Sequence, residues 1–284
     1  LDNIHHRLLA THELTMNLVG TYYKSDYNYQ YSELSDGVTD FETATDINLG
    51  KYSLIGEAIY NYNMKTAQLY VGSRYMYNNS TQKNLSSNNQ TLTNEIYSYI
   101  GVTGILGKKF NYSVSAGVNG NIFTTIENKE YKFVYFRPQV KLGYFIDESS
   151  DLTFNYEVNT DNPAVSSLTY NPYYRDANYL FTGNPNLKPS NNYALSLSYF
   201  KGFKKFVLNA EVAYSYNKDA IVPVLQSDDT NIIETFGNLD NAQNMKASLF
   251  LQWYPFSNNI LRLRLYSEVF HQINAFGNEK WNHT

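Results

Sequence analysis

The sequence predicts an all-β protein, an antiparallel transmembrane β-barrel of which about eleven strands lie within these 284 residues. Three observations predict it. Apolar and polar residues alternate along most of the chain, short and long connections follow one another, and aromatic residues make up 16% of the sequence, with 28 tyrosines. The mean hydropathy of −0.46 is compatible with such strands, because an alternating segment averages out to polar. No apolar run reaches the roughly 18 residues that a spanning helix needs.

Charge and composition exclude several other classes of protein. The 22 Lys and Arg residues are outnumbered by 26 Asp and Glu residues, so the formal net charge is −4 and no basic surface for nucleic acid is expected. Cysteine is absent, which excludes disulfides, thiolate zinc sites and cysteine nucleophiles. The many large rings supply apolar surface to bury, so the composition also argues against disorder.

Strict period-two alternation is clearest in the second half of the chain. Leu195 and Leu197 share one face of a predicted strand, and Ser196 and Ser198 share the other. The same alternation occurs in residues 206–216, 246–253 and 261–266, and earlier in residues 110–119 and 152–158. These runs predict strands that each have one apolar side.

The composition of the two faces favours a membrane barrel over a soluble sheet. The polar faces are rich in Ser, Asn, Gly and Thr, which suits a water-filled lumen, and apolar stripes carry rings near their ends, as at Tyr193, Tyr199 and Trp253. Tyrosine and tryptophan are good strand formers in any sheet, so a soluble β-sandwich or propeller is the alternative interpretation.

The connections alternate in length, as in outer-membrane barrels, which have short periplasmic turns at one rim and long loops at the other. Most predicted strands exceed the roughly 9–11 residues that cross a bilayer, so several should project beyond it. Short links are expected near Met64–Thr66, Gly107–Lys109, Asp147–Ser150, Lys201–Lys205 and Pro255–Asn259. Longer links are expected near Lys24–Gly50, Asn79–Thr93, Thr160–Ser190 and Pro223–Thr230.

Several short motifs support one family resemblance. Gly183 to Pro189 reads Gly-Asn-Pro-Asn-Leu-Lys-Pro and precedes an alternating strand, Leu168 to Tyr173 reads Leu-Thr-Tyr-Asn-Pro-Tyr, and Phe236 to Asn238 reads Phe-Gly-Asn. Together they resemble motifs of the β-barrel domain of TonB-dependent outer-membrane receptors, in the outer membrane protein beta-barrel family. The resemblance extends over about Tyr52–Tyr254 and is most specific in Phe136–Tyr199.

The resemblance implies an outer-membrane protein whose complete barrel has about 22 strands. It also implies an N-terminal plug domain and a TonB box, neither of which is found in this sequence. We therefore expect residues 1–284 to be the C-terminal portion of a barrel domain, without its plug and without the final strands. The implied partners are outer-membrane lipid and, through the absent plug, the TonB complex; a surface lipoprotein is a further candidate, and the solute is not specified.

The sequence shows no catalytic constellation, cofactor motif or metal site, so we do not expect an enzyme. The five histidines lie near the chain ends, at His5, His6, His12, His271 and His283, and no Gly-x-Ser-x-Gly element occurs. An outer-membrane enzyme would need a Ser/His set or paired carboxylates in the wall. The expected function is binding and TonB-dependent uptake of a solute, and the alternative is a passive porin-like or structural barrel.

Ligand contact is expected in the long Thr160–Ser190 link, which contains four of the seven prolines. Its candidate residues combine aromatic faces with a cation and are Tyr170, Tyr173, Tyr174, Arg175 and Tyr179. Such a set suits sugars, chelates or peptides, but the rings could equally pack the link upon itself. A second cluster with the same two interpretations comprises Tyr22, Tyr23, Tyr27, Tyr29 and Tyr31.

Overall fold

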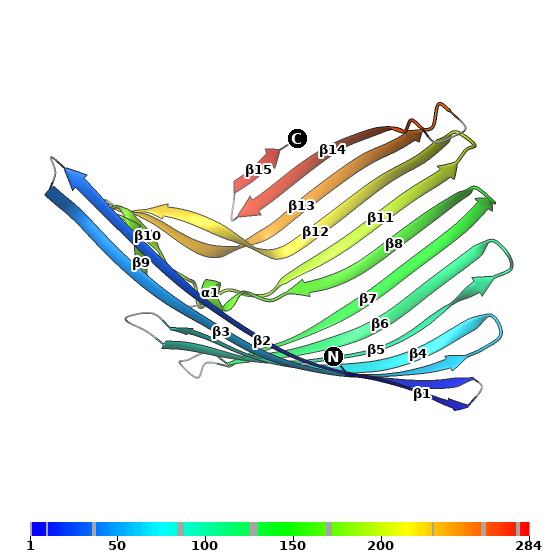
Figure 1. Cartoon of the computed structure of the whole chain (residues 1–284), viewed down its shortest axis with the longest axis horizontal. Helices are drawn as coiled ribbons and strands as arrows, with labels where there is room; N and C mark the ends of the chain where they lie inside the picture. The colour runs from blue at the N-terminus through cyan, green and yellow to red at the C-terminus, as the bar shows by residue number, and fades with distance from the viewer. Residues whose placement is uncertain are drawn as a thin grey trace.

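The computed structural model describes residues 2–9, 11–35, 38–83, 88–124, 130–168, 172–228, 230–256, 260–276 and 279–283. These residues form a 15-stranded sheet that curves into a section of barrel wall (Figure 1). The strands are β1 (Asp2–Leu9), β2 (His12–Ser35), β3 (Val38–Asn63), β4 (Ala67–Lys83), β5 (Asn88–Leu106), β6 (Phe110–Thr124), β7 (Glu130–Asp147), β8 (Ser150–Asp161), β9 (Tyr173–Asp176), β10 (Tyr179–Phe181), β11 (Ser190–Gly202), β12 (Phe206–Ser227), β13 (Ile232–Trp253), β14 (Leu263–Phe276) and β15 (Glu279–His283).

From β1 to β8 and from β11 to β15, strands that follow one another in sequence are neighbours in the wall and pair antiparallel, and β8 pairs antiparallel with β11. Eleven of the described strands have at least twelve residues, in agreement with the number expected from the sequence. Tight turns join β3 to β4, β5 to β6, β7 to β8 and β11 to β12, all at the right-hand end of Figure 1. This end corresponds to the short-turn rim of an outer-membrane barrel.

Three of the four long links expected from the sequence are wrong, because they are paired strands. The pairing of β2 with β3 runs from His12↔Tyr62 to Ser35↔Val38, through the described residues on both sides of the region expected to be a loop at Lys24–Gly50. The strand pairs β4–β5 and β12–β13 likewise extend through most of 79–93 and 223–230. The polar residues there still alternate with Tyr, Ile and Val, so the ladder continues beyond the bilayer into water.

The apolar side chains face outward and the polar ones are buried, the reverse of a soluble protein. Leu195, Leu249 and Leu263 are 38%, 39% and 46% exposed, whereas Asn121 on the opposite face is only 2% exposed. No second sheet or helix covers these leucines within the described residues. The sequence-based assignment of the apolar face to lipid is therefore confirmed.

Tyrosines on the inner face lie flat against glycines of neighbouring strands. A Cβ added at Gly72 would lie 2.4 Å from the Tyr99 ring, and one added at Gly101 would lie 2.3 Å from the Tyr70 ring. The two rings meet edge to face at 6.2 Å. Glycine is needed at these positions because the ring occupies the space of the missing side chain.

The link between β8 and β11 folds into the barrel mouth, and we call its described residues, 162–168 and 172–189, the strap. It contains the short helix α1 (Val165–Leu168) and the hairpin of β9 and β10. Strand β10 adds to the wall by pairing parallel with β13, from Tyr179↔Ile232 to Phe181↔Glu234. In Figure 1 this hairpin lies at the end of the sheet opposite the tight turns.

Among the described residues, no helix is long and apolar enough to cross a membrane.

Candidate ligand-binding site

A cavity of about 420 Å³ lies where the strap meets the β2–β3 hairpin. Its walls are mainly aromatic and aliphatic, with three polar side chains among them. The lining residues are Ser25, Tyr27, Tyr29, Ile47, Leu49, Gln82, Tyr173, Arg175 and Phe181. An apolar pocket with a few polar groups is the usual composition of a small-molecule site.

Aromatic contacts hold the strap against the β2–β3 hairpin. The Tyr29 hydroxyl donates a hydrogen bond to the backbone carbonyl of Arg175. Phe41 of β3 meets Tyr174 of β9 edge to face with ring centroids 6.0 Å apart. Within the strap hairpin, the ring of Tyr173 lies 5.2 Å from that of Phe181. Members of the two tyrosine clusters, which the sequence places more than 120 residues apart, thus line one cavity: Tyr27 and Tyr29 from the first and Tyr173 from the second.

Arg175 is fixed by groups on β13 and β10. Its Nη1 donates to Oε2 of Glu234 at 2.5 Å, and its guanidinium lies 4.9 Å from the centroid of the Phe181 ring. The hydroxyl of Tyr179 donates to the same Glu234 oxygen at 2.8 Å. This hydrogen bond, and to a lesser extent burial, raises the pKa of Tyr179 above its ordinary value, so the phenol remains a donor in neutral solution.

Gln82 contributes a buried side-chain amide to the cavity wall. The residue sits near the end of β4 beside Leu49, with which it is paired across the strands, and it is 7% exposed. Its Oε1 is buried and accepts no hydrogen bond from the residues that the structure describes. A buried carbonyl oxygen of this kind is costly unless a donor reaches it.

The residues expected from the sequence take different parts in this site. Tyr173 and Arg175 line the cavity. Tyr174 is 39% exposed and packs against Phe41, and Tyr179 donates to Glu234; neither residue lines the cavity. Tyr170 lies outside the described residues.

Sequence reasoning missed Ile47, Leu49, Gln82 and Phe181. Tyr27 and Tyr29 alternate along β2 and so share a face, as do Ile47 and Leu49 on β3. That alternation was present in the sequence, but the segment was interpreted as a loop. Nothing in the sequence indicated that Gln82 would be brought beside these residues.

The motif Gly183–Pro189 anchors the end of the strap to the wall. The Asn184 side chain donates to the carbonyl of Phe236 at 2.8 Å, and its Oδ1 accepts the backbone N–H of Asn186 at 2.9 Å. Leu187 is 3% exposed. Tyr131 of β7 donates to the carbonyl of Pro185 at 2.7 Å. The strap is therefore held against the wall by its β9–β10 hairpin and by its C-terminal end.

The inner wall carries a network of charged and polar groups. Glu95 accepts from Arg74 at 3.3 Å and from Asn119 at 3.2 Å, although it is only 6% exposed. Arg137 donates to Asn159 at 2.6 Å and lies 5.0 Å from the centroid of the Tyr97 ring. Paired charges of this kind lower the cost of placing ionised groups in the wall. Within the described residues, no three His, Asp or Glu side chains form a metal-binding group.

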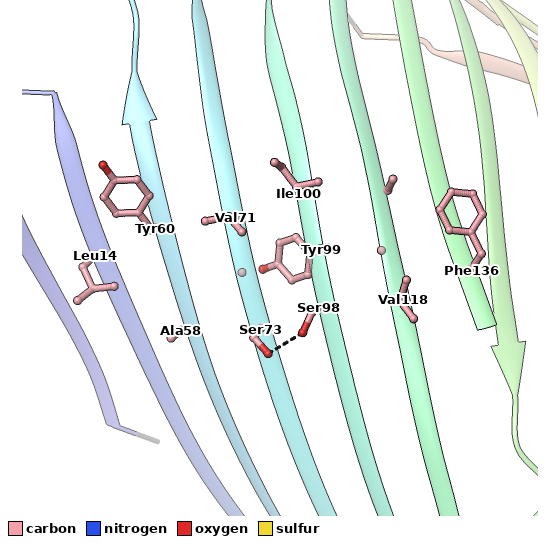
Figure 2. A pocket seen from close by; sticks show the side chains of 13 residues that line it. Leu14, Ala58, Tyr60, Val71, Ser73, Ser98, Tyr99, Ile100, Val118 and Phe136 are labelled. Atoms are coloured by element: carbon pink, nitrogen blue, oxygen red, sulfur yellow. Dashed lines mark hydrogen bonds between the residues drawn. The ribbon is translucent and has the colours of Figure 1, made fainter. Parts of the chain in front are cut away.

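The outer face has a shallow apolar groove of about 620 Å³ across β2 to β7 (Figure 2). Small residues form its floor, including Ser73 and Ser98, whose hydroxyls hydrogen-bond to each other at 2.9 Å. Larger side chains such as Leu14 and Phe136 stand at its two sides (Figure 2). The two serine hydroxyls are hydrogen-bonded to each other, as polar groups on a surface in contact with hydrocarbon need to be.

An outward apolar face, a polar inner wall and antiparallel strands long enough to cross a bilayer define a β-barrel protein of the outer membrane. The chain belongs to the outer membrane protein beta-barrel family, whose model matches residues 106–282, more than half of its length. The location expected from the sequence, the outer membrane, is thereby confirmed.

Solved structures show the same fold. The copper transporter OprC aligns with a TM-score of 0.70 at 10% identity, over 97% of this chain and 44% of its own. FpvAI in its complex with pyocin S2 aligns at 0.65 and 10% identity, over 96% and 40% of the two chains. BauA, the ferric preacinetobactin receptor from Acinetobacter baumannii, aligns at 0.64 and 10% identity, over 96% and 44%.

The chain thus spans less than half the length of these structures. Its resemblance to barrels of TonB-dependent receptors, expected from the sequence motifs, is confirmed at the level of the fold. No protein of curated function matches the sequence significantly.

Proposed function

We propose that this chain is the ligand-binding section of an outer-membrane receptor that takes up a solute by TonB-dependent transport. Its role is to bind the solute at the outer rim and to pass it through the barrel, without making or breaking covalent bonds. The observation that carries the proposal is the strap, which folds into the barrel mouth and builds an aromatic cavity at the rim opposite the tight turns.

The position of this cavity fits a receptor better than an open pore. The tight turns mark the periplasmic rim, so the cavity and the strap lie on the outer side of the membrane. The charged inner wall, with Arg74, Glu95 and Arg137, offers polar contacts along the lumen. A passive porin needs an unobstructed channel, whereas here the strap occupies part of the mouth.

We further propose that residues 1–284 are the C-terminal portion of a larger barrel domain. The solved structures of similar fold are more than twice as long as the parts that align with this chain. In this proposal a plug domain encoded elsewhere in the protein contacts the inner wall and connects it to the TonB complex. A surface lipoprotein is a further proposed partner at the outer rim, and outer-membrane lipid contacts the apolar face.

The test uses the full-length protein in its native bacterium. Strains lacking the receptor, lacking TonB, or lacking both are grown on a panel of ferric chelates and oligosaccharides as limiting nutrients. The proposal expects one nutrient whose uptake is lost equally in all three strains. Uptake that persists without TonB would overturn it.

A planar-bilayer measurement on the same full-length protein distinguishes the proposed receptor from the alternative, a passive porin-like barrel. The receptor is expected to show no steady conductance, because the plug and the strap obstruct the lumen. Steady ohmic conductance without TonB would instead identify a porin-like barrel.

A further inference from the structure

We propose that the cavity between the strap and the β2–β3 hairpin binds a neutral carbohydrate, with a sugar ring between its aromatic walls and a sugar hydroxyl donating to Gln82. This inference rests on the proposed function as a solute receptor and names the chemical class of the solute. The ligand is selected by three properties of the described residues: flat aromatic faces, an unpartnered acceptor and a balanced charge.

The aromatic walls suit a ligand with flat apolar faces. The rings of Tyr27 and Tyr29 are nearly parallel, 6° between planes, with centroids 6.5 Å apart. Tyr173 and Phe181 supply further rings from the strap. The C–H faces of a sugar ring pack on such surfaces, while the hydroxyls at its edge remain free to hydrogen-bond.

Gln82 supplies the acceptor for one of those hydroxyls. Its Oε1 is buried and has no partner among the described residues, and the residue lines the same cavity as the rings. Ser25 and Arg175 are the other polar residues of the wall. A ligand that donates a hydrogen bond to Gln82 repays the desolvation of this oxygen, whereas a purely apolar ligand leaves it unpaired.

The charge of the surroundings selects against charged ligands. Among the described lining residues Arg175 is the one cationic side chain, and Glu234 neutralises it at 2.5 Å. No other charged side chain lines the described part of the cavity, so an anionic chelate meets no free cation there. A cation meets no lining carboxylate either. A neutral hydroxylated ring needs no such partner.

The test measures binding to the purified full-length receptor by isothermal titration calorimetry. The neutral probes are maltohexaose, cellohexaose, xylohexaose and mannohexaose, and the charged probes are ferric enterobactin and hexalysine. At least one neutral hexasaccharide is expected to bind and neither charged probe to do so. Loss of the hydroxyl contact in Gln82→Leu should weaken that binding about tenfold, and loss of the ring in Tyr27→Ala by at least as much.

Gln30→Leu is the matched control, because Gln30 lies on β2 next to Tyr29 with its side chain exposed on the opposite face. It should leave the affinity unchanged. Binding of ferric enterobactin or hexalysine alone, binding of no hexasaccharide, or equal effects of Gln82→Leu and Gln30→Leu would overturn the inference. In that case, TonB-dependent uptake of a chelate would still support the proposed function. Conversely, hexasaccharide binding together with TonB-independent uptake would overturn the proposed function but not this inference.

Discussion

Asn238 of β13 and Lys188 at the end of the strap contact each other twice. The Asn238 Oδ1 accepts the backbone N–H of Lys188 at 2.8 Å, and its Nδ2 donates to the Lys188 carbonyl at 2.9 Å. The same Nδ2 donates to the carbonyl of Asp219 at 2.7 Å, and Asp219 adopts a positive φ of 56°. Two motifs separated in sequence, Gly183–Pro189 and Phe236–Asn238, are therefore the two sides of one contact.

Asn238→Asp should release this end of the strap. The carboxylate cannot donate, so both Nδ2 bonds are lost, and the expected destabilisation is about 1–3 kcal/mol. Limited proteolysis of the purified protein should show faster cleavage within 162–189. The barrel itself should stay folded, so its electrophoretic mobility on gels should still change on heating. Asn244→Asp on the same strand is the control. Equal cleavage rates in both variants would contradict the proposed role of Asn238.

Gly72→Val should destabilise the wall, because any Cβ at this position meets the Tyr99 ring at 2.4 Å. That ring has little freedom to move, since it stacks on Tyr97 at 5.1 Å. The expected cost is about 1–3 kcal/mol, measured by urea-induced unfolding from liposomes. Gly56→Val on the neighbouring strand has open space around its Cβ and should cost less. If Tyr99→Ala does not relieve the effect of Gly72→Val, ring contact is not its cause.

Leu197→Lys and Ser198→Lys test which face of the sheet meets lipid. The two residues are adjacent on β11, so their side chains point to opposite faces. A lysine at Leu197 enters hydrocarbon and should cost about 2–4 kcal/mol near the bilayer midplane. A lysine at Ser198 enters the lumen opposite Glu211, its cross-strand neighbour, and should be tolerated. The reverse order of stabilities in liposomes would show that the faces are assigned wrongly.

The turn between β7 and β8 should make stability depend on pH in acid. Lys201 donates to Asp147 at 2.8 Å, and this bond, with those from Ser150 and Ser149, holds the pKa of the Asp147 carboxyl well below its ordinary value of about 3.9. Because the pKa of Asp147 is lower in the folded protein, the stabilisation is complete at pH values above the pKa of the unfolded state. It is lost as the pH falls through the pKa of the folded state.

Lys201→Met should therefore lower the urea midpoint at pH 7, and the difference from the wild type should shrink below about pH 4. The measurement is equilibrium unfolding from liposomes at a series of pH values. Lys204→Met, in the β11–β12 turn without an ion pair to Asp147, is the control. A difference that is constant from pH 7 to pH 3 would exclude Asp147 as the titrating partner.

The wall of the barrel could be predicted from sequence because its signal is local. Alternation such as Leu195 and Leu197 against Ser196 and Ser198 determines which side chains face lipid, and polar turns determine where hairpins reverse. The ends of the strands were harder to predict. At Lys24–Gly50 a polar composition suggested a loop, but Tyr27, Tyr29, Ile47 and Leu49 kept the alternation that extends β2 and β3.

The candidate site was predicted only in part. The sequence indicated which residues have side chains suited to a ligand, but it did not indicate which of them lie close together in the fold. Tyr173 and Arg175 were recognised from the cluster of rings beside a cation. Their partners Tyr29 and Gln82 come from strands far away in sequence, and only the curvature of the wall brings them to the strap. The parallel pairing of β10 with β13 also has no local signal, since no turn connects the two strands.

The strap has a consequence for the order in which the protein folds. Each hairpin of the wall joins segments that follow one another, whereas Tyr29 and Arg175 are 146 residues apart and meet only across the mouth. Closing so long a loop costs entropy that only an assembled wall can repay. The strap should therefore dock last, so a newly inserted barrel would pass through a stage in which its outer entrance stands open.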